Sequence, residues 1–426
     1  MPIRKFLTIS LVALSLAACK KADTALVIPN LMPRGGDSTS AEFVNAQSEV
    51  ATLRSDLTLH PDKLDDYTKL AMIFLQEARV SGRHHEYFPV ASRLLDETLR
   101  RDSLNFEGLV LRAGMQMTMH RFAEAKQTIV KAIKVNPHNS GAYGILADAN
   151  TELGLYDEAV KAVDTMISTR PDLRSYARAS YQRELRGDLN GALAAMRLAV
   201  DAGAYGQESR EWSVYQYANL FLNEGKLDTA QFLYNGILEE RPNYGFALSG
   251  LAMVAVAKHD YPTAIEHLVK ATQVLPEHIF LEQLSDLYVA MGDREDAKQL
   301  EEKVIAAFAV HEADGWNVAR EYALYCANHG IHLDEALTRA EADYRTRPHN
   351  IDALDTYAWC LLKNGRAADA APLANEALRM SPLNPTIWYH AAVIAHSTGD
   401  TVVASARYAR CGYLPCIYTS TSLAIR

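Results

Sequence analysis

Two adjacent histidines, His84 and His85, are the residues of this chain that most readily suggest metal chemistry. Imidazole nitrogens bind zinc and other transition metals, but a site needs three or four ligands around one point. Neighbouring residues on a loop rarely both bind one ion, and no further set of cysteine, histidine and carboxylate residues has the spacing to complete the shell. The sequence therefore predicts no metal site and places both histidines on a solvated loop, residues 80–89.

The local patterns of common catalytic sites are also missing from the sequence. It contains no nucleophile elbow with Ser between two glycines, no phosphate-binding P-loop, no helical zinc-protease motif and no Cys-x-x-Cys pair. His329 and His332 flank Gly330 in a predicted turn, where surface positions are expected rather than a proton relay. We therefore expect a protein that is not an enzyme and that requires no cofactor.

The elements that would position any functional residue are helices in pairs. Over residues 350–382, apolar side chains recur on one helical face and alanines stand where two helices would approach closely. Asn364 and Gly365 mark the turn, and Pro382 ends the second helix. The pattern recurs along the chain, and three pairs of prolines lie 34 residues apart: Pro137 and Pro171, Pro242 and Pro276, and Pro348 and Pro382.

A 34-residue helix–turn–helix period over about residues 64–416 resembles the tetratricopeptide repeat. The resemblance implies an all-α fold of about ten hairpins, stacked into a right-handed superhelix with a concave groove, in which each repeat contacts mainly its neighbours. Two repeats are longer than the period. The first has extra residues at 80–89, and the seventh continues through 309–315.

The repeats set the expected division of the chain. Residues 61–416 form the solenoid, residues 41–60 form an N-terminal helix that covers the first repeat, and residues 417–426 form a tail. Ser40 is a candidate N-cap of that helix. A length of 426 residues would suggest two or three compact domains, but stacked repeats share one continuous core.

The N-terminus has the features of an export signal. Arg4 and Lys5 precede an apolar run, residues 6–16, that is too short to span a bilayer. The run ends in Leu-Ala-Ala followed by Cys19, which resembles a bacterial lipobox. The resemblance implies a lipoprotein signal peptide, residues 1–18, cleavage before Cys19 and a lipid on that cysteine. An ordinary secretory peptide or an uncleaved helix is the alternative.

The segment that follows the cysteine, residues 19–40, contains prolines, glycines and polar residues without helical periodicity. It is expected to be a flexible tether between the lipid and the repeats. Lys20 follows Cys19, and no Asp stands there as an inner-membrane retention signal. By resemblance to enterobacterial sorting, we expect a protein of the bacterial cell envelope, anchored in the outer membrane and facing the periplasm.

Candidate binding residues lie on the first helix of each repeat, at positions 2, 5, 9, 12 and 13, which line the concave side in the family that the chain resembles. Aromatic and amide side chains are frequent there, although such positions face solvent unless something covers them. They could bind a partner or pack against one another across a tight groove. The groove set is Tyr181, Trp212, Tyr215, Asn219, Phe246, Tyr325, Asn328, Trp359 and Tyr389.

Cysteine usage and charge add two expectations. Cys411 and Cys416 flank a turn-like segment and could form a disulfide in an oxidising periplasm, whereas Cys326 and Cys360 occupy equivalent positions of successive repeats, too far apart to bridge. The formal charge is −9, and it becomes −11 when the leader with Arg4 and Lys5 is removed. Net negative charge argues against nucleic-acid binding, which requires a basic surface.

Two functions are consistent with these features. The first is a membrane-anchored TPR-like scaffold that binds a protein or peptide in its groove, as part of a cell-envelope assembly or secretion system. The second is a glycan-binding accessory of polysaccharide export or cell-wall remodelling, with groove aromatics stacking on sugar rings. The carboxylate clamp of the family is doubtful here, because Tyr215 stands beside Asn219 where a clamp would have Lys or Arg.

Overall fold

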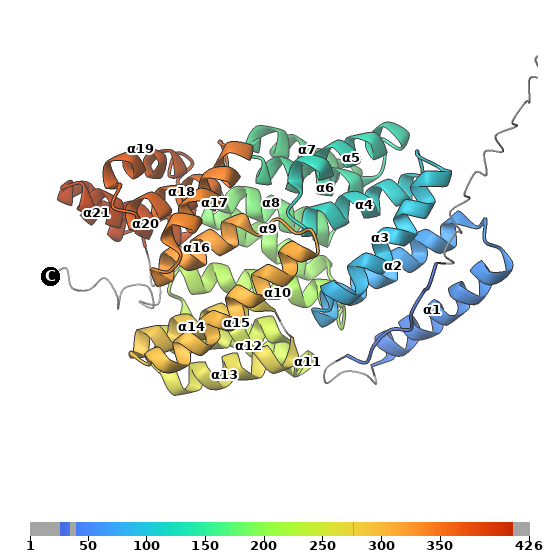
Figure 1. Cartoon of the computed structure of the whole chain (residues 1–426), viewed down its shortest axis with the longest axis horizontal. Helices are drawn as coiled ribbons and strands as arrows, with labels where there is room; N and C mark the ends of the chain where they lie inside the picture. The colour runs from blue at the N-terminus through green and yellow to red at the C-terminus, as the bar shows by residue number, and fades with distance from the viewer. Residues whose placement is uncertain (1–25, 35–39, 276, 412–426) are drawn as a thin grey trace, which may run out of the picture.

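The computed structural model describes residues 26–34, 40–275 and 277–411, and regular structure in these ranges is entirely helical. Twenty-one helices follow one another along the described chain (Figure 1). Their bounds are α1 Ala41–Leu59, α2 Leu64–Ser81, α3 His84–Arg101, α4 Phe106–Thr118, α5 Phe122–Val135, α6 Ser140–Glu152, α7 Tyr156–Thr169, α8 Leu173–Glu184, α9 Leu189–Ala202, α10 Glu208–Asn223, α11 Leu227–Glu240, α12 Gly245–Ala257, α13 Tyr261–Val274, α14 His278–Met291, α15 Arg294–Ala313, α16 Ala319–His329, α17 Leu333–Thr346, α18 Ile351–Lys363, α19 Ala367–Ala377, α20 Pro385–Ser397 and α21 Thr401–Tyr408.

The helices after α1 form ten hairpins, from α2 with α3 to α20 with α21, and the hairpins stack on one another. The prediction of an all-α fold of about ten helical pairs is confirmed. Helix α1 stands outside the pairs, with Phe43, Val50, Leu53 and Leu57 buried. Ser40 accepts a hydrogen bond from the Phe43 amide, which confirms it as the N-cap.

Local sequence explains why the helices begin where they do. Asn105, Asn139 and Asn350 each precede a first helix, and each side chain accepts the backbone N–H three residues further on. Asp188 and Asp260 cap second helices in the same way. Such a cap stabilises a helix by about 1 kcal/mol relative to Ala. The caps fix the turns between hairpins, and therefore the places where the inner helices start.

Small buried residues allow the helices of a hairpin to pack closely. Ala71, Ala113 and Ala252 occupy the eighth position of first helices and are fully buried. Two repeats have serine at this position. Ser180 donates to the Ala192 carbonyl oxygen at 2.8 Å, and Ser285 donates to the Ala297 carbonyl oxygen at 3.4 Å. A hydroxyl is accommodated here only because it bonds directly to the paired helix.

Part of the expected tether is packed against the repeats. Residues 26–34 run between α1 and the first hairpin, and Leu31 is buried there. Arg34 is 5% exposed and forms a bidentate ion pair with Glu77, in which Nη2 lies 2.5 Å from Oε1 and Nε lies 3.0 Å from Oε2. The Met32 amide donates to the Tyr87 hydroxyl. This stretch therefore joins the core, and the tether that we propose is confined to residues before it.

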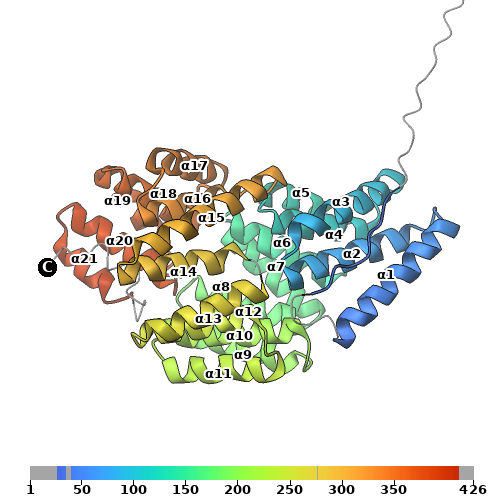
Figure 2. The ribbon, with the colours of Figure 1, turned by 60° about the horizontal axis from the view of Figure 1, so that its bottom comes forward.

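The superhelix closes on itself. Helices α15 to α18 lie beside the early repeats in both views (Figures 1 and 2). Hydrogen bonds join residues about two hundred positions apart, including Arg347 to Glu152 and the Asn317 amide to the Met119 carbonyl oxygen. The expectation that each repeat contacts mainly its neighbours is confirmed, and the few bonds between the two turns of the superhelix add to those contacts. The resemblance to the repeat family predicts the structure of each hairpin. The curvature of this particular stack brings the two turns of the superhelix into contact.

One contact between the turns, the histidine seam, consists of His84, His85, His120, His311 and Trp316. Trp316 stacks on His311 with ring centroids 5.0 Å apart, and its other neighbours include His84 at 5.2 Å. Phe88 also stacks on this indole. The expected loop at 80–89 was wrong, because α2 continues to Ser81 and α3 starts at His84. The two repeats that exceed the period thus contact each other.

A second contact between the two turns of the superhelix is named the corner seam. It joins the interhelical loops 151–156 and 184–187 to the interhelical loops 347–351 and 381–383. Backbone groups make the central bonds: the Ile351 amide donates to the Tyr156 hydroxyl at 2.9 Å, and the Leu383 amide donates to the Glu184 carbonyl oxygen at 3.0 Å. Asn350, besides capping α18, donates its side-chain amide to the Thr151 carbonyl oxygen. This seam holds α8 against α18 and α20.

Candidate functional site

The inner face of the superhelix carries the predicted groove residues on α8, α10, α12, α16, α18 and α20. The closed path of the stack divides them into three groups. Trp212, Tyr215, Asn219 and Phe246 lie together on the middle repeats, and Tyr325, Asn328, Trp359 and Tyr389 lie on the last repeats. Tyr181 lines a separate pocket between the two turns.

The middle group is an aromatic cluster of Trp212, Tyr215 and Phe246. Trp212 meets Phe246 edge-to-face with ring centroids 5.1 Å apart, and Tyr215 lies 5.4 Å from Trp212 and 5.7 Å from Phe246. All three side chains are half-buried. Aromatic rings in this arrangement have favourable edge contacts and still offer apolar surface to a ligand. The cluster is the group of three neighbouring aromatic rings among the predicted groove residues that remains partly exposed.

The last group is mostly inside the core. Tyr325, Trp359 and Tyr389 are only 3–5% exposed. Trp359 stacks on His390 at 4.1 Å, and Tyr325 donates its hydroxyl to Ser285. Packing between repeats, the second interpretation of the groove aromatics, accounts for these three positions. No ligand contacts them unless the repeats move.

The two predicted amides are engaged within the protein. Asn219 accepts the Tyr234 hydroxyl at 2.5 Å and donates to Gln216. Asn328 accepts the indole N–H of Trp359 at 2.8 Å. Each amide oxygen therefore orients a buried aromatic ring. The amides shape the inner face, and the residues that can reach a ligand are the aromatic cluster and Tyr181.

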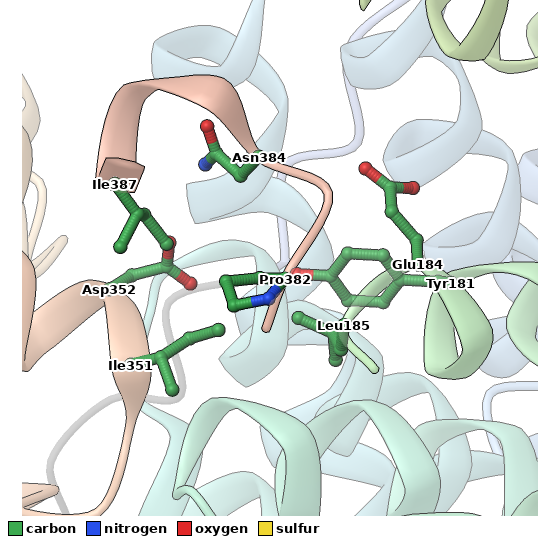
Figure 3. Close-up of a pocket in the computed structure, with 8 residues that line it drawn as sticks. All are labelled: Tyr181, Glu184, Leu185, Ile351, Asp352, Pro382, Asn384 and Ile387. Atoms are coloured by element: carbon green, nitrogen blue, oxygen red, sulfur yellow. The ribbon is translucent and has the colours of Figure 1, made fainter. Parts of the chain in front are cut away.

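Tyr181 belongs to a pocket of about 50 Å³ where the corner seam joins the two turns (Figure 3). Its ring points across the pocket toward Pro382 and Asp352. Although the side chain is 40% exposed, burial raises the pKa of its hydroxyl well above the ordinary value. A side chain that is accessible to solvent and is also surrounded by many protein atoms is typical of a cavity inside the protein rather than of its outer surface. The lining residues are Tyr181, Glu184, Leu185, Ile351, Asp352, Pro382, Asn384 and Ile387.

Two carboxylates in this pocket, Glu184 and Asp352, were missing from the predicted set. Among the described residues neither has a hydrogen bond or ion pair. Burial, and then the nearby Asp352, raises the pKa of Glu184 to about 7. Burial also raises the pKa of Asp352, although Arg320 and Arg347 oppose it. Glu184 and Asp352 occupy positions 12 and 2 of their helices. The rule that selected the groove residues, positions 2, 5, 9, 12 and 13 of each first helix, could therefore have found them.

The remaining predicted residues lie away from the inner face. Cys19 and Cys416 lie outside the described residues, so lipidation and the disulfide stay predictions. Cys411 is buried and its thiol donates to the Arg407 carbonyl oxygen at 3.4 Å. Cys326 and Cys360 are buried free thiols, as expected.

Two searches of the described part of the chain bear on other kinds of site. In residues 26–34, 40–275 and 277–411, no three or more His, Cys, Asp or Glu side chains are grouped to hold a metal ion. Over the same residues, none of the helices combines the length and apolar character needed to cross a bilayer.

The hairpins around a common inner face define a helical repeat scaffold. Residues 116–182 and residues 358–410 each match a model of the tetratricopeptide repeat. The chain therefore contains tetratricopeptide repeats, which build protein-binding scaffolds that are generally not enzymatic.

Individual proteins are similar over shorter stretches or at low identity. Over 145 residues the chain is 29% identical to cellulose synthase operon protein C of Pseudomonas fluorescens (strain SBW25), and the match covers 32% of this chain but only 11% of that protein. The structure of Pseudomonas aeruginosa pilF is 14% identical, covering 50% of this chain and 98% of that one, with a TM-score of 0.39. The human IFIT1 dimer with m7Gppp-AAAA is 12% identical, covering 90% and 88%, with a TM-score of 0.46.

Proposed function

We propose that this protein holds an extended peptide segment of a partner protein against its inner face, as a scaffold of a bacterial cell-envelope assembly or secretion system. The observation that supports this most is the aromatic cluster of Trp212, Tyr215 and Phe246, which is half-buried and open on the inner side of a protein-binding repeat stack. Aromatic side chains that are partly covered by their neighbours are typical anchors for a bound chain.

The closure of the superhelix limits how a partner can bind. Both seams hold the turns together through hydrogen bonds and stacked rings, so the inner face is reached along the axis of the superhelix. A narrow, extended segment fits such an entrance, whereas a folded domain does not. We therefore expect the partner to contribute a terminus or an unfolded linker rather than a globular surface.

A pull-down from detergent-solubilised envelopes tests this function. Full-length protein should retain a stoichiometric protein partner, and Trp212→Ala should release it because the anchor ring is lost. Phe232→Ala is the matched control, since Phe232 is 75% exposed on α11 and belongs to no aromatic pair of the cluster. Equal retention by the Trp212 variant would contradict the assignment of the cluster.

A glycan-binding role is the second candidate. The similarity to a cellulose synthase operon protein favours it, and half-buried aromatic rings also stack on sugars. Retention on immobilised cellulose or peptidoglycan, lost with Trp212→Ala and without any protein partner, would support this role over the first.

The proposed location depends on Cys19. A lipid on this cysteine would anchor the repeats at the outer membrane, with two or three acyl chains for stable attachment. Metabolic labelling with an alkynyl palmitate should mark the wild-type protein and not Cys19→Ser. Label on the Cys19→Ser variant would refute the lipoprotein prediction, and fractionation of the labelled protein would distinguish the outer from the inner membrane.

A further inference from the structure

We propose that the pocket between α8 and α18 to α20 binds a lysine or arginine side chain of the peptide segment that occupies the inner face. The inference rests on the proposed peptide-binding function and specifies one residue class of the ligand. The pocket is lined by the apolar residues Leu185, Ile351, Pro382 and Ile387, and by polar groups of Tyr181, Asp352 and Glu184. The Asp352 carboxylate lies toward the Tyr181 hydroxyl, and Glu184 lies near the other end of the ring (Figure 3).

The shape and polarity of the pocket match a long cationic side chain. Lysine and arginine have an aliphatic stem of several methylenes and a charged end, so they bury the stem on apolar surface and keep the charge near polar groups. The pocket has a volume of about 50 Å³, which offers room beside its apolar wall for part of such a stem. An apolar side chain would fill the wall but would leave the two half-buried carboxylates without an ion-pair partner, which is unfavourable.

Neither carboxylate of the pocket has an ion-pair partner among the described residues, and Arg320 and Arg347 act on Asp352 only from beyond ion-pair distance. Arg347 is held by Asp343 and Glu152, and Arg320 lies 3.2 Å from Glu321. Lys363 stands over the Trp359 ring at 4.6 Å. The nearby basic residues are thus engaged elsewhere. Burial, followed by repulsion from Asp352, raises the pKa of Glu184. A ligand cation would relieve that repulsion.

The position of the pocket gives binding a structural consequence. Its walls come from repeat four on one side and repeats nine and ten on the other, so a bound side chain would contact both turns of the superhelix. A ligand cation there would add an ionic contact across the corner seam. Binding and closure should therefore stabilise each other.

Selection from a random linear-peptide library on the immobilised full-length protein tests the proposal. Selected peptides should contain a lysine or arginine that cannot be exchanged for norleucine without a loss of affinity. By calorimetry, Asp352→Asn should weaken the binding of the basic peptide at least about tenfold, or 1.4 kcal/mol. Asp228→Asn, at a 97% exposed carboxylate on α11, should leave the affinity unchanged.

A double-mutant cycle separates a lost contact from a damaged protein. The norleucine peptide should bind Asp352→Asn and the wild type equally, because the interacting partner is already absent from the peptide. Selected peptides without basic residues, or a basic peptide that binds Asp352→Asn as tightly as the wild type, would overturn the pocket assignment and leave the scaffold function standing. If no peptide is selected, both the pocket assignment and the peptide-binding function fail.

Discussion

Contacts within the repeat stack and contacts across the seams are made from different chemistry. Inside a hairpin, fully buried alanines such as Ala113 and Ala218 bring helix against helix over their whole length. Across the corner seam, backbone amides, an arginine and turn glycines meet at a few points. The stack therefore depends on apolar area, whereas the seam depends on the exact position of a small number of polar groups.

The turn glycines show this difference most directly. Gly154 and Gly365 occupy equivalent turns and both have left-handed backbones, with φ near 73° and 75°. A Cβ added to Gly154 would lie 2.5 Å from the amide nitrogen of Asn350, whereas one added to Gly365 would have nothing within 4 Å. The sequence position is the same, but only one of the two turns touches the other half of the molecule.

Removal of the arginine that crosses the corner seam should have the largest effect. Arg347 is 3% exposed and bonds to Asp343 and Glu152. Arg347→Ala leaves a buried carboxylate unpaired, so we expect the free energy of unfolding in urea to fall by about 3–5 kcal/mol. Arg345→Ala, at a 74% exposed side chain, should cost less than about 0.5 kcal/mol. Similar losses for both variants would mean that the seam adds nothing to the stack.

A methyl group in the seam should have the next largest effect. Both Gly154→Ala and Gly365→Ala strain a left-handed turn, at a cost of about 1 kcal/mol. Only Gly154→Ala forces two backbones apart, so it should lose about 1–3 kcal/mol more and should increase the radius of gyration in small-angle scattering. Equal stabilities and equal radii would contradict the closed superhelix.

The carboxylate at the seam pocket should make stability depend on pH. The pKa of Glu184 is raised to about 7 from 4.5, so the folded state holds the proton more tightly than the unfolded state. Stability is therefore lost as pH rises from about 4.5 to 7. Glu184→Gln should gain about 2 kcal/mol relative to the wild type at pH 8 and nothing near pH 4. Glu158→Gln, an exposed control on α7, should show no such change.

The histidine seam should show a pH dependence in the same direction but of smaller size, with stability lost as pH rises. The hydrogen bond from His85 to Asp314, at 2.6 Å, raises the pKa of this exposed histidine. Its contribution is present below about pH 6.5 and is lost as pH rises through the higher folded value. His85→Gln should cost less than about 1 kcal/mol at pH 6 and nothing at pH 9. His138→Gln serves as the exposed control, and a cost independent of pH would exclude the ionic contact.

Sequence alone was sufficient for the parts of the fold that depend on neighbouring residues. Spaced alanines and prolines predicted the hairpins, and Ser40 was correctly expected to cap α1. Closure could not be predicted, because it depends on small rotations between repeats that add up along the stack. For that reason His84 was placed in a loop, and Trp359 was listed with groove residues although it is 4% exposed. Glu184 and Asp352 required only the positional rule, but their shared pocket and their lack of an ion-pair partner among the described residues are visible only in three dimensions.

The extra length of the first and seventh repeats also affects the order of events during synthesis. Hairpins form from residues close together, but the seams join groups separated by 195 to 229 positions. A growing chain can therefore build most of its stack while the inner side is still open, and it closes only after the later repeats leave the ribosome. In pulsed hydrogen exchange during refolding, the Ile351 amide should gain protection after amides inside the early hairpins, and simultaneous protection would contradict this order.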